Sequence, residues 1–526
     1  MKKNTFTLSL LTTSILLSGC AAMTDSGTGS ADRQVAYEQD KVYKLTVLNT
    51  NDNHGRFWKN GKSEWGMSAR KTLVDNIRAE VEKEGGEVLF LSGGDINTGV
   101  PESDLQDAIP DFKGMNLLGY DAMAVGNHEF DNSMDIIKMQ QEIADFPFLA
   151  ANIYKTEDGS RLFKPYELFE YDGLTVAVMG MTTDDTQKLA FAENIKGLEF
   201  RSPVEVAEEL VPELEEKADI IIAATHMGHY ANANFGANAP GDVTLAREVD
   251  GIDMIVGGHS QDPLFEPDIQ NGTVIVQAQE WGKYVGRTDF EFKNGELTMV
   301  DYELIPVNSR KSEIKYQENA DMLALLTPYQ ERGEKLVSGI VGEVNERLKG
   351  ERGEVRFGYT NMGSLMIAAQ MAKTDADFGM ANSGGIRASI EPGKISYKDI
   401  LTVQPFSNSI AYVELTGEEV LNYLDVVALK PTDSGAFAHF GGIEMTISEK
   451  GVSNVSIGGE PLVEEKVYRM SFNNYSASGG DGYPKLSDHP NYVNTGYMDA
   501  EVLKEFIEAH SPIDVADFEP KGIKRI

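Results

Sequence analysis

The chain is poor in cysteine and in basic side chains, and both shortages limit what it can be. Only one of its 526 residues is a cysteine, so no intramolecular disulfide can form. Lysine and arginine number 47 against 83 acidic residues, which gives a formal net charge of −36. Such an acidic surface repels phosphate backbones, and we therefore expect no nucleic-acid polymer among its partners. A local cluster of metal ions and arginines could still hold a small phosphorylated ligand.

Long apolar runs are also missing. The stretch Phe6–Leu17 is largely apolar but only about a dozen residues long, which is typical of a signal peptide and too short to span a membrane. It leads into Ser18-Gly19-Cys20, which resembles the bacterial lipobox. We expect residues 1–19 to be a lipoprotein signal peptide and Cys20 to be lipidated; the alternative is an ordinary signal peptide with a chance cysteine. Ala21, in place of aspartate, favours the outer membrane, on its periplasmic or cell-surface side.

The length predicts more than one domain, because a single core stops growing well below this size. Residues 20–40 are small and polar and predict a flexible tether. We place a first domain at 41–320 and a second at 343–526. The charged, helix-forming segment 321–342 is interpreted as a linker helix with a hinge in its C-terminal half, and the alternative is another surface helix.

Short apolar runs, each ending in a polar loop, predict the fold of the first domain. Helix-like segments at 69–83 and 203–217 lie between several of them. Continuous apolar strands separated by helices indicate a layered α/β core with buried sheets, and ligands bind beyond the carboxyl ends of such strands. The expected strands are 42–48, 88–91, 122–125, 220–224 and 254–256. The second domain carries further strand-like runs at 410–415 and 467–472.

The loops after these strands carry residues that bind metals. Five of the eight histidines, at 54, 128, 226, 229 and 259, fall in them. Two ligand sets that share one carboxylate would make a dinuclear site, and mixed nitrogen and oxygen ligands suit zinc, manganese, cobalt or nickel better than calcium. Magnesium is a further option for the two divalent ions. The candidate ligands are Asp52, His54, Asp95, Asn127, His226, His259 and Gln261.

The stretch Gly126–Asp131 combines an amide, an imidazole and a carboxylate in one loop. Asn127 and His128 could each bind a metal or a charged substrate. Asp131, three residues on, could hold the imidazole of His128 in one tautomer. Taken alone, the stretch could equally be a polar turn after a buried strand.

The order of these motifs resembles that of the calcineurin-like metallophosphoesterases: Asp52-x-His54, Gly94-Asp95, Gly126-Asn127-His128-Glu129, His226 and Gly258-His259. Gln261, where the general pattern has histidine, is similar to the 5′-nucleotidase branch. The resemblance implies one metal on Asp52, His54, Asp95 and Gln261, and a second on Asp95, Asn127, His226 and His259. It also implies that His128 and Asp131 form a catalytic dyad that stabilises charge on the phosphate.

The second domain contributes candidate substrate-binding residues. Arginines suit phosphate, although ordinary surface ion pairs are the alternative, and aromatic side chains can stack on a base or simply pack in a core. The segments 382–387, 404–408 and 474–483 resemble the C-terminal domain of the 5′-nucleotidase/UDP-sugar hydrolase family. That resemblance implies substrate binding by Arg352, Arg356, Arg387, Phe406, Asn408, Tyr475 and Asp481. It also implies a domain rotation that carries the nucleotide to the metals.

The sequence therefore predicts a metallophosphoesterase fold, a layered β-sandwich flanked by helices, followed by a second α/β substrate-binding domain. We expect a monomeric, lipid-anchored enzyme that scavenges nucleotides as a 5′-nucleotidase. A preference for UDP-sugars or for 2′,3′-cyclic nucleotides is the alternative within the same class, and a non-catalytic surface binding module is the alternative outside it.

Overall fold

The computed structural model describes residues 36–526 except 191–193, 231–239 and 407. The predicted signal peptide, Cys20 and most of the predicted tether therefore lie outside the described residues. Ala36–Ile526 belong to one compact unit. Within this part of the chain, no helix combines the length and the apolar character needed to cross a membrane.

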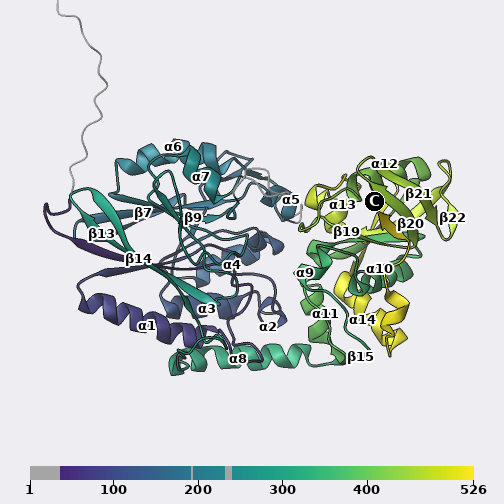
Figure 1. Ribbon diagram of the computed structural model, residues 1–526, viewed down its shortest axis with the longest axis horizontal. Coiled ribbons are helices and arrows are strands. Elements are labelled where there is room, and N and C mark those ends of the chain that lie inside the picture. Colours follow the sequence, from purple (N-terminus) through teal and green to yellow (C-terminus); the bar gives the residue numbers. More distant parts are fainter. Residues whose placement is uncertain (1–35, 191–193, 231–239, 407) are drawn as a thin grey trace, which may run out of the picture. The chain divides into compact units, whose positions relative to one another are not determined.

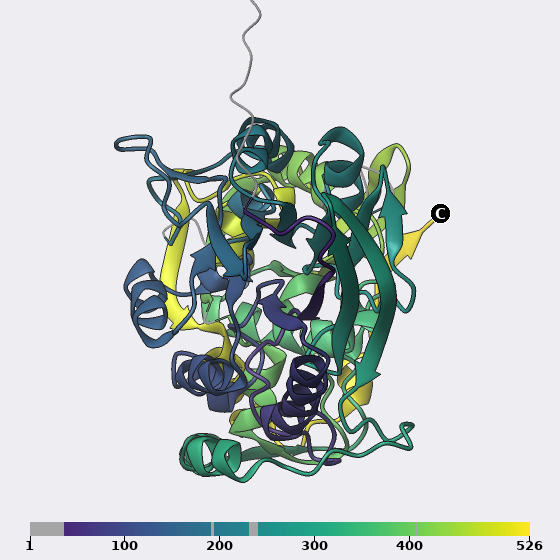
Figure 2. The same ribbon diagram turned by 90° about the vertical axis from the view of Figure 1, so that its left-hand side faces the viewer.

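Two six-stranded sheets form the centre of the first domain (Figures 1 and 2). The first has the order β14 (Glu296–Pro306), β13 (Tyr284–Lys293), β1 (Tyr43–Thr50), β2 (Glu87–Ser92), β3 (Ala122–Ala124) and β4 (Phe148–Leu149). The second has the order β11 (Asp268–Gln270), β12 (Thr273–Val276), β10 (Met254–Val256), β9 (Ile220–His226), β7 (Leu174–Thr182) and β6 (Tyr166–Tyr171). The runs β1–β2–β3–β4 and β7–β9–β10–β12 are parallel.

The sheets pack face to face, with helices on both outer faces. Val47, Leu89 and Ile222 belong to the buried apolar cluster between the sheets. A second cluster joins the first sheet to α1 (Met67–Lys83), α3 (Ile109–Leu118) and α4 (Met134–Ile143), and a third joins the second sheet to α6 (Pro203–Glu215) and α7 (Asp242–Glu248). The predicted strands and both predicted helices are present, so the layered sandwich is confirmed.

Parallel pairing places the five candidate loops together. Strands β1, β2 and β3 run in the same direction in one sheet, and β9 and β10 do so in the other. Each of the five is followed by one of the loops that carry metal-binding residues. Because parallel strands end at the same edge of a sheet, the loops meet at one edge of the sandwich.

The segment between the two halves is largely one helix, α8 (Ala320–Val337). Its residues Met322 and Leu326 are buried in the same cluster as α1 and α3. The helix contains Pro328 and ends at Val337. It occupies most of the predicted linker, while the hinge and the domain boundaries remain predictions.

The second half is built on separate sheets. A five-stranded sheet has the order β19 (Ala438–Gly441), β16 (Phe378–Asn382), β23 (Val467–Asn473), β18 (Ser409–Thr416) and β24 (Tyr492–Met498). A four-stranded sheet has the order β22 (Glu460–Pro461), β21 (Gly451–Ile457), β20 (Ile443–Ser448) and β25 (Ile523–Arg525), and β15 (Ile340–Val344) pairs with β17 (Gly393–Ser396). The helices are α9 (Arg352–Val355), α10 (Asn361–Thr374), α11 (Tyr397–Val403), α12 (Gly417–Val427), α13 (Asn474–Ala477) and α14 (Asp499–His510).

An ion pair between a buried carboxylate and a partly exposed lysine joins the two halves beside α8. Glu102, on the short helix α2 (Pro101–Asp104), is 1% exposed and pairs with Lys398 of α11. Gly333 of α8 packs on the same carboxylate side chain, since a Cβ at that position would lie 2.6 Å from the Glu102 Cβ. The carboxylate therefore has little access to water and depends on Lys398 for its charge partner.

Lys398→Met should lower the free energy of unfolding by about 1–3 kcal/mol, because it leaves a buried carboxylate without its cation. Urea unfolding would measure the change. The double variant Glu102→Gln/Lys398→Met removes both charges and should recover part of the loss. A Lys398→Met protein that unfolds like the wild type would show that Glu102 finds another partner.

Candidate active site

Asp95 is the centre of the group of predicted metal-binding residues. Its Oδ2 lies 3.0 Å from His226 Nε2 and 4.0 Å from His54 Nε2. The same His54 nitrogen is 3.8 Å from Asp52 Oδ1. Loops from both sheets therefore bring their side chains to one carboxylate.

The remaining predicted ligands complete two adjoining clusters. His259 Nδ1 lies 2.9 Å from Asn127 Oδ1 and 3.3 Å from His226 Nε2. Gln261 Nε2 lies 3.0 Å from His54 Nε2 on the other side. All seven predicted metal-binding residues are thus brought together, and the division of these residues between two ions remains a prediction.

Five of these seven residues have an unusual backbone. Asp52, His54, Asp95, His259 and Gln261 all have φ between 49° and 75°, in the left-handed region that side chains other than glycine rarely adopt. Neighbouring glycines allow the loops to approach: a Cβ at Gly126 would lie 2.1 Å from Asp95 Oδ1, and one at Gly258 would lie 2.3 Å from the Gly93 carbonyl oxygen. Clusters of such strained residues are characteristic of functional sites.

Glu129 holds two of the loops in register. Its buried carboxylate accepts hydrogen bonds from the backbone N–H groups of Gly126, Asp95, Ile96 and Asn97, at 2.6 to 3.3 Å. It therefore connects the loop after β2 to the loop after β3 by a charged acceptor that water does not reach. The sequence motif predicts no chemistry for Glu129, because such a network of backbone contacts exists only in the folded chain.

The rings of the histidines are oriented as in a metal site. His226 Nδ1 lies 2.6 Å from the Gly93 carbonyl oxygen and His54 Nδ1 lies 2.8 Å from that of Thr98, so each ring donates its Nδ1–H and turns Nε2 towards Asp95. Such second bonds to ring nitrogens are typical of metal-binding histidines. Burial lowers the pKa of His54 and of His259 to about 3. These unprotonated nitrogens are in the form that binds a cation. Burial would lower the pKa of His226, but the charges of Asp95 and Asp52 outweigh it and raise that pKa to about 10, so an ion bound there would displace the proton.

His128 and Asp131 form the predicted pair. His128 Nδ1 lies 2.6 Å from Asp131 Oδ2, within the short helix η1 (His128–Asp131). The backbone N–H of His128 donates to Asp95 Oδ1 at 2.9 Å. Burial would lower the pKa of His128, but the charges of Asp131 and Asp95 outweigh it and raise that pKa. The imidazole is therefore disposed to be a cation next to the metal-binding residues.

The geometry also leaves a second role open to His128. Its Nε2 lies 4.0 Å from Asp95 Oδ2, and the ligand atoms of His54, Asp95 and His128 all lie within 4.8 Å of one another. These three side chains could on distance alone hold an ion, as could Asp95 with His226 and His259. The exclusion of His128 from the ligand set thus remains a prediction.

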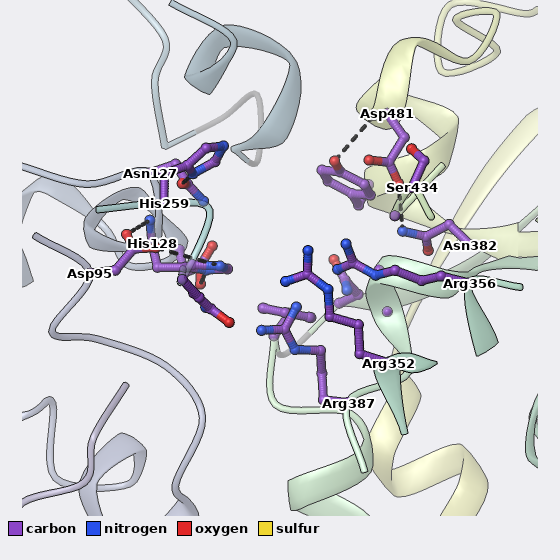
Figure 3. A pocket seen from close by; sticks show the side chains of 18 of the residues that line it. Asp95, Asn127, His128, His259, Arg352, Arg356, Asn382, Arg387, Ser434 and Asp481 are labelled. Carbon is purple, nitrogen blue, oxygen red and sulfur yellow. Dashed lines mark hydrogen bonds and ion pairs between the residues drawn. The ribbon is translucent and has the colours of Figure 1, made fainter. Parts of the chain in front are cut away.

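A cavity of about 160 Å³ opens in front of these residues and is closed on its other side by the second half of the chain (Figure 3). Arg352, Arg356 and Arg387 face it. Among the described residues, none of the three has a carboxylate partner within ion-pair distance. Burial and the charges of Arg352 and Arg387 lower the pKa of Arg356 to about 9. Three guanidinium groups that repel one another in this way would be stabilised by an anion.

The other predicted substrate-binding residues line the same cavity: Phe406, Asn408, Tyr475 and Asp481. The Phe406 ring lies nearly parallel to His128, with centroids 5.6 Å apart and an interplanar angle of 11°. The Arg387 guanidinium lies 5.3 Å from the centre of the same phenyl ring. Phe406 thus contacts groups from both halves of the chain, and the base sandwich between Phe406 and Tyr475 remains a prediction.

Several residues of the cavity wall were not predicted. Asn382 lies in the Asn-Ser-Gly-Gly-Ile-Arg run and Tyr230 follows His229, so both stand beside recognised motifs. Ser434 and Gly435 belong to no motif that the sequence analysis used, and only the fold brings them to the cavity.

Glu129→Ala should reduce both stability and metal content, because four backbone N–H groups would lose a buried acceptor. We expect a loss of about 2–4 kcal/mol in unfolding free energy. Calorimetric unfolding and elemental analysis would measure the two effects. The substitution Glu129→Gln keeps one acceptor oxygen, so it should lower the unfolding free energy and the metal content less than Glu129→Ala does. Full metal content in Glu129→Ala would contradict the role of Glu129 in holding the loops.

Comparisons with known proteins cover nearly the whole chain. Residues 45–263 match the calcineurin-like phosphoesterase family and residues 340–488 match the 5′-nucleotidase C-terminal domain. The chain is 53% identical to a 5′-nucleotidase of Vibrio cholerae, over 99% of each chain, and 52% identical to the protein UshA of Escherichia coli, over 95% and 97% respectively. A 5′-nucleotidase precursor from Thermus thermophilus has a similar crystal structure, with a TM-score of 0.78, 27% identity and coverage of 92% of this chain and 99% of that one.

The two family matches fall on the two halves that the sheets define, and the His/Asp clusters lie in the first of them. With more than half of its residues identical to a 5′-nucleotidase over its whole length, the chain belongs to the 5′-nucleotidase family and is a nucleotide hydrolase of the metallophosphoesterase type.

Proposed function

We propose that this enzyme releases phosphate from 5′-nucleoside mono-, di- and triphosphates outside the inner membrane, so that the nucleoside and phosphate can be taken up. The observation that carries the proposal is the cavity itself. One wall holds the metal-binding residues with the His128–Asp131 pair. The other holds two aromatic rings and three guanidinium groups that have no carboxylate partner in the described part of the chain. This combination suits a ligand with a phosphate at one end and a flat base at the other.

The proposed metal sites use the two clusters around Asp95. We assign Asp52, His54, Asp95 and Gln261 to one divalent ion, and Asp95, Asn127, His226 and His259 to the other. The support is the donor set, in which ring nitrogens, amide groups and carboxylate oxygens converge. When bound, the two ions would supply an acidified water and neutralise phosphate oxygens.

The chain's own side chains would orient the substrate and stabilise charge. Arg352, Arg356 and Arg387 would bind the phosphate side, and Phe406 and Tyr475 would stack on the base. His128, held by Asp131, would place its cationic Nε2–H towards the phosphate as negative charge develops there. Asn408 and Asp481 would accept or donate hydrogen bonds to the nucleoside.

Phosphate release from AMP, ATP, UDP-glucose and 2′,3′-cyclic AMP, combined with metal analysis of the purified protein, tests this proposal. We expect two divalent ions per chain and the highest kcat/KM on the 5′-nucleotides. A dominant rate on UDP-glucose or on the cyclic nucleotide would replace the substrate assignment. Nucleotide binding without phosphate release in the presence of manganese or zinc would refute the catalytic role.

We also propose that Cys20 carries the lipid that holds the enzyme, as a monomer, on the outer membrane. The sequence pattern before Cys20 supports this assignment. Labelling with a palmitate analogue followed by membrane fractionation would test it. Cys20→Ser should lose both the label and the membrane association, and a soluble wild-type protein would refute the anchor.

A further inference from the structure

The hydroxyl group of Tyr475 is bonded to the backbone of Asp481. The backbone N–H of Asp481 donates to Tyr475 Oη at 3.1 Å. The side chain of the same residue is held separately, because Asn382 Nδ2 donates to Asp481 Oδ2 at 2.7 Å. Figure 3 shows the Asp481 and Asn382 side chains together on the wall of the cavity, which Tyr475 also lines.

The loop that carries Asp481 lies directly against the tyrosine ring. A Cβ at Gly480 would be 2.5 Å from Tyr475 Cζ, so only glycine allows this approach. Asp481 itself has a left-handed backbone, with φ 58° and ψ 16°. A loop in this conformation needs contacts that hold it, and the hydrogen bond from the Asp481 N–H to the Tyr475 hydroxyl is one of them.

This corner of the cavity has more hydrogen-bond acceptors than donors. Asp481 is 7% exposed and Asn382 is 3% exposed. Asn382 uses its amide nitrogen on Asp481, and within the described residues its buried Oδ1 has no hydrogen-bond partner. A carboxylate and an amide oxygen together would accept O–H or N–H groups from a ligand.

We propose that Tyr475 is a positioning residue: its hydroxyl accepts the backbone N–H of Asp481 and so holds that residue where its carboxylate accepts hydrogen bonds from the nucleoside part of the substrate. The role is separate from stacking, which needs only the ring, and it rests on the proposed function in nucleotide hydrolysis. The nucleoside offers two kinds of donor, the ribose hydroxyls and the N–H groups of the base.

Tyr475→Phe tests the hydroxyl while keeping the ring. We expect KM for AMP to rise roughly 3- to 10-fold with kcat little changed, since a ground-state contact would be weakened. Hydrolysis of p-nitrophenyl phosphate, which has no nucleoside, should not change. Tyr483→Phe is the matched control, because the Tyr483 hydroxyl is buried nearby but donates to the Ala436 carbonyl oxygen at 2.6 Å. Its kinetics should remain those of the wild type.

A double-mutant cycle with Asp481→Asn separates positioning from a general loosening of the loop. If the hydroxyl acts through the carboxylate, Tyr475→Phe should change KM by less than about twofold once Asp481 is already replaced. A smaller effect of Tyr475→Phe on 2′,3′-dideoxyadenosine 5′-monophosphate, which lacks both ribose hydroxyls, would assign the donor to the ribose, and an equal effect would assign it to the base. Either pattern supports positioning.

Two results would overturn the proposal while the proposed function stands. One is an unchanged KM for AMP in a Tyr475→Phe protein with normal thermal unfolding. The other is an equal change with AMP and p-nitrophenyl phosphate. Failure of the proposed function would look different, because the wild-type enzyme itself would then release no phosphate from AMP.

Discussion

Asp95→Asn should abolish phosphate release from AMP, lowering kcat roughly 10³-fold or more, and should reduce the bound metal. Both Asp95 oxygens are engaged: Oδ2 faces His226 and His54, and Oδ1 accepts the N–H of His128. Two cations close to one another repel strongly unless an anionic group lies between them. Asparagine has nearly the same shape but no charge, and its NH₂ group would point at one of the cation positions.

The measurement pairs steady-state kinetics with elemental analysis of the purified variant. Asp253→Asn is a suitable control, because Asp253 is also largely buried and accepts the Ile221 N–H at 2.8 Å, an interaction that asparagine can keep. It should retain most of the activity. An Asp95→Asn protein with two metals and full activity would refute the shared role of Asp95.

His128→Asn should keep both metals and lose about 10²- to 10³-fold in kcat. The side chain would still accept or donate a hydrogen bond, but the cation that Asp131 and Asp95 favour would be gone. Asp131→Asn should have a smaller effect in the same direction, because the imidazole would remain but would lose the carboxylate that orients it.

The His128→Asn variant also decides whether His128 binds a metal ion or stabilises charge in the transition state. Because His54, Asp95 and His128 lie close enough to bind one ion, loss of a metal from His128→Asn would make His128 a ligand. If the variant keeps both metals but reacts slowly, His128 acts on the transition state and is not a metal ligand. Elemental analysis therefore carries as much weight as the rate.

Hydrophobic patterning and motif order predict a large part of this structure. The runs ending before Asp52, Asp95 and Asn127 are strands, and parallel pairing brings their loops together as expected. The reason is that a buried parallel strand needs a continuous apolar run, which is visible in the sequence. Asp52 and His54 can also be recognised in the sequence, because a metal-binding loop needs such side chains at a fixed spacing.

Features that depend on contacts between distant segments could not be predicted. The four hydrogen bonds of Glu129, the stacking of Phe406 on His128 and the Lys398–Glu102 pair each join residues that no local pattern connects. The left-handed backbone of His259 and Gln261 is equally invisible, because it is imposed by the neighbouring loops.

The left-handed ligands have a consequence for attempts to improve the enzyme. Each such residue costs on the order of 1 kcal/mol or more, so five of them together approach the 5–15 kcal/mol by which a typical protein is stable. Glycine would relieve the strain at every one of these positions and destroy the site. Selection for thermostability alone would therefore favour inactive variants, and a useful search must demand activity at every round.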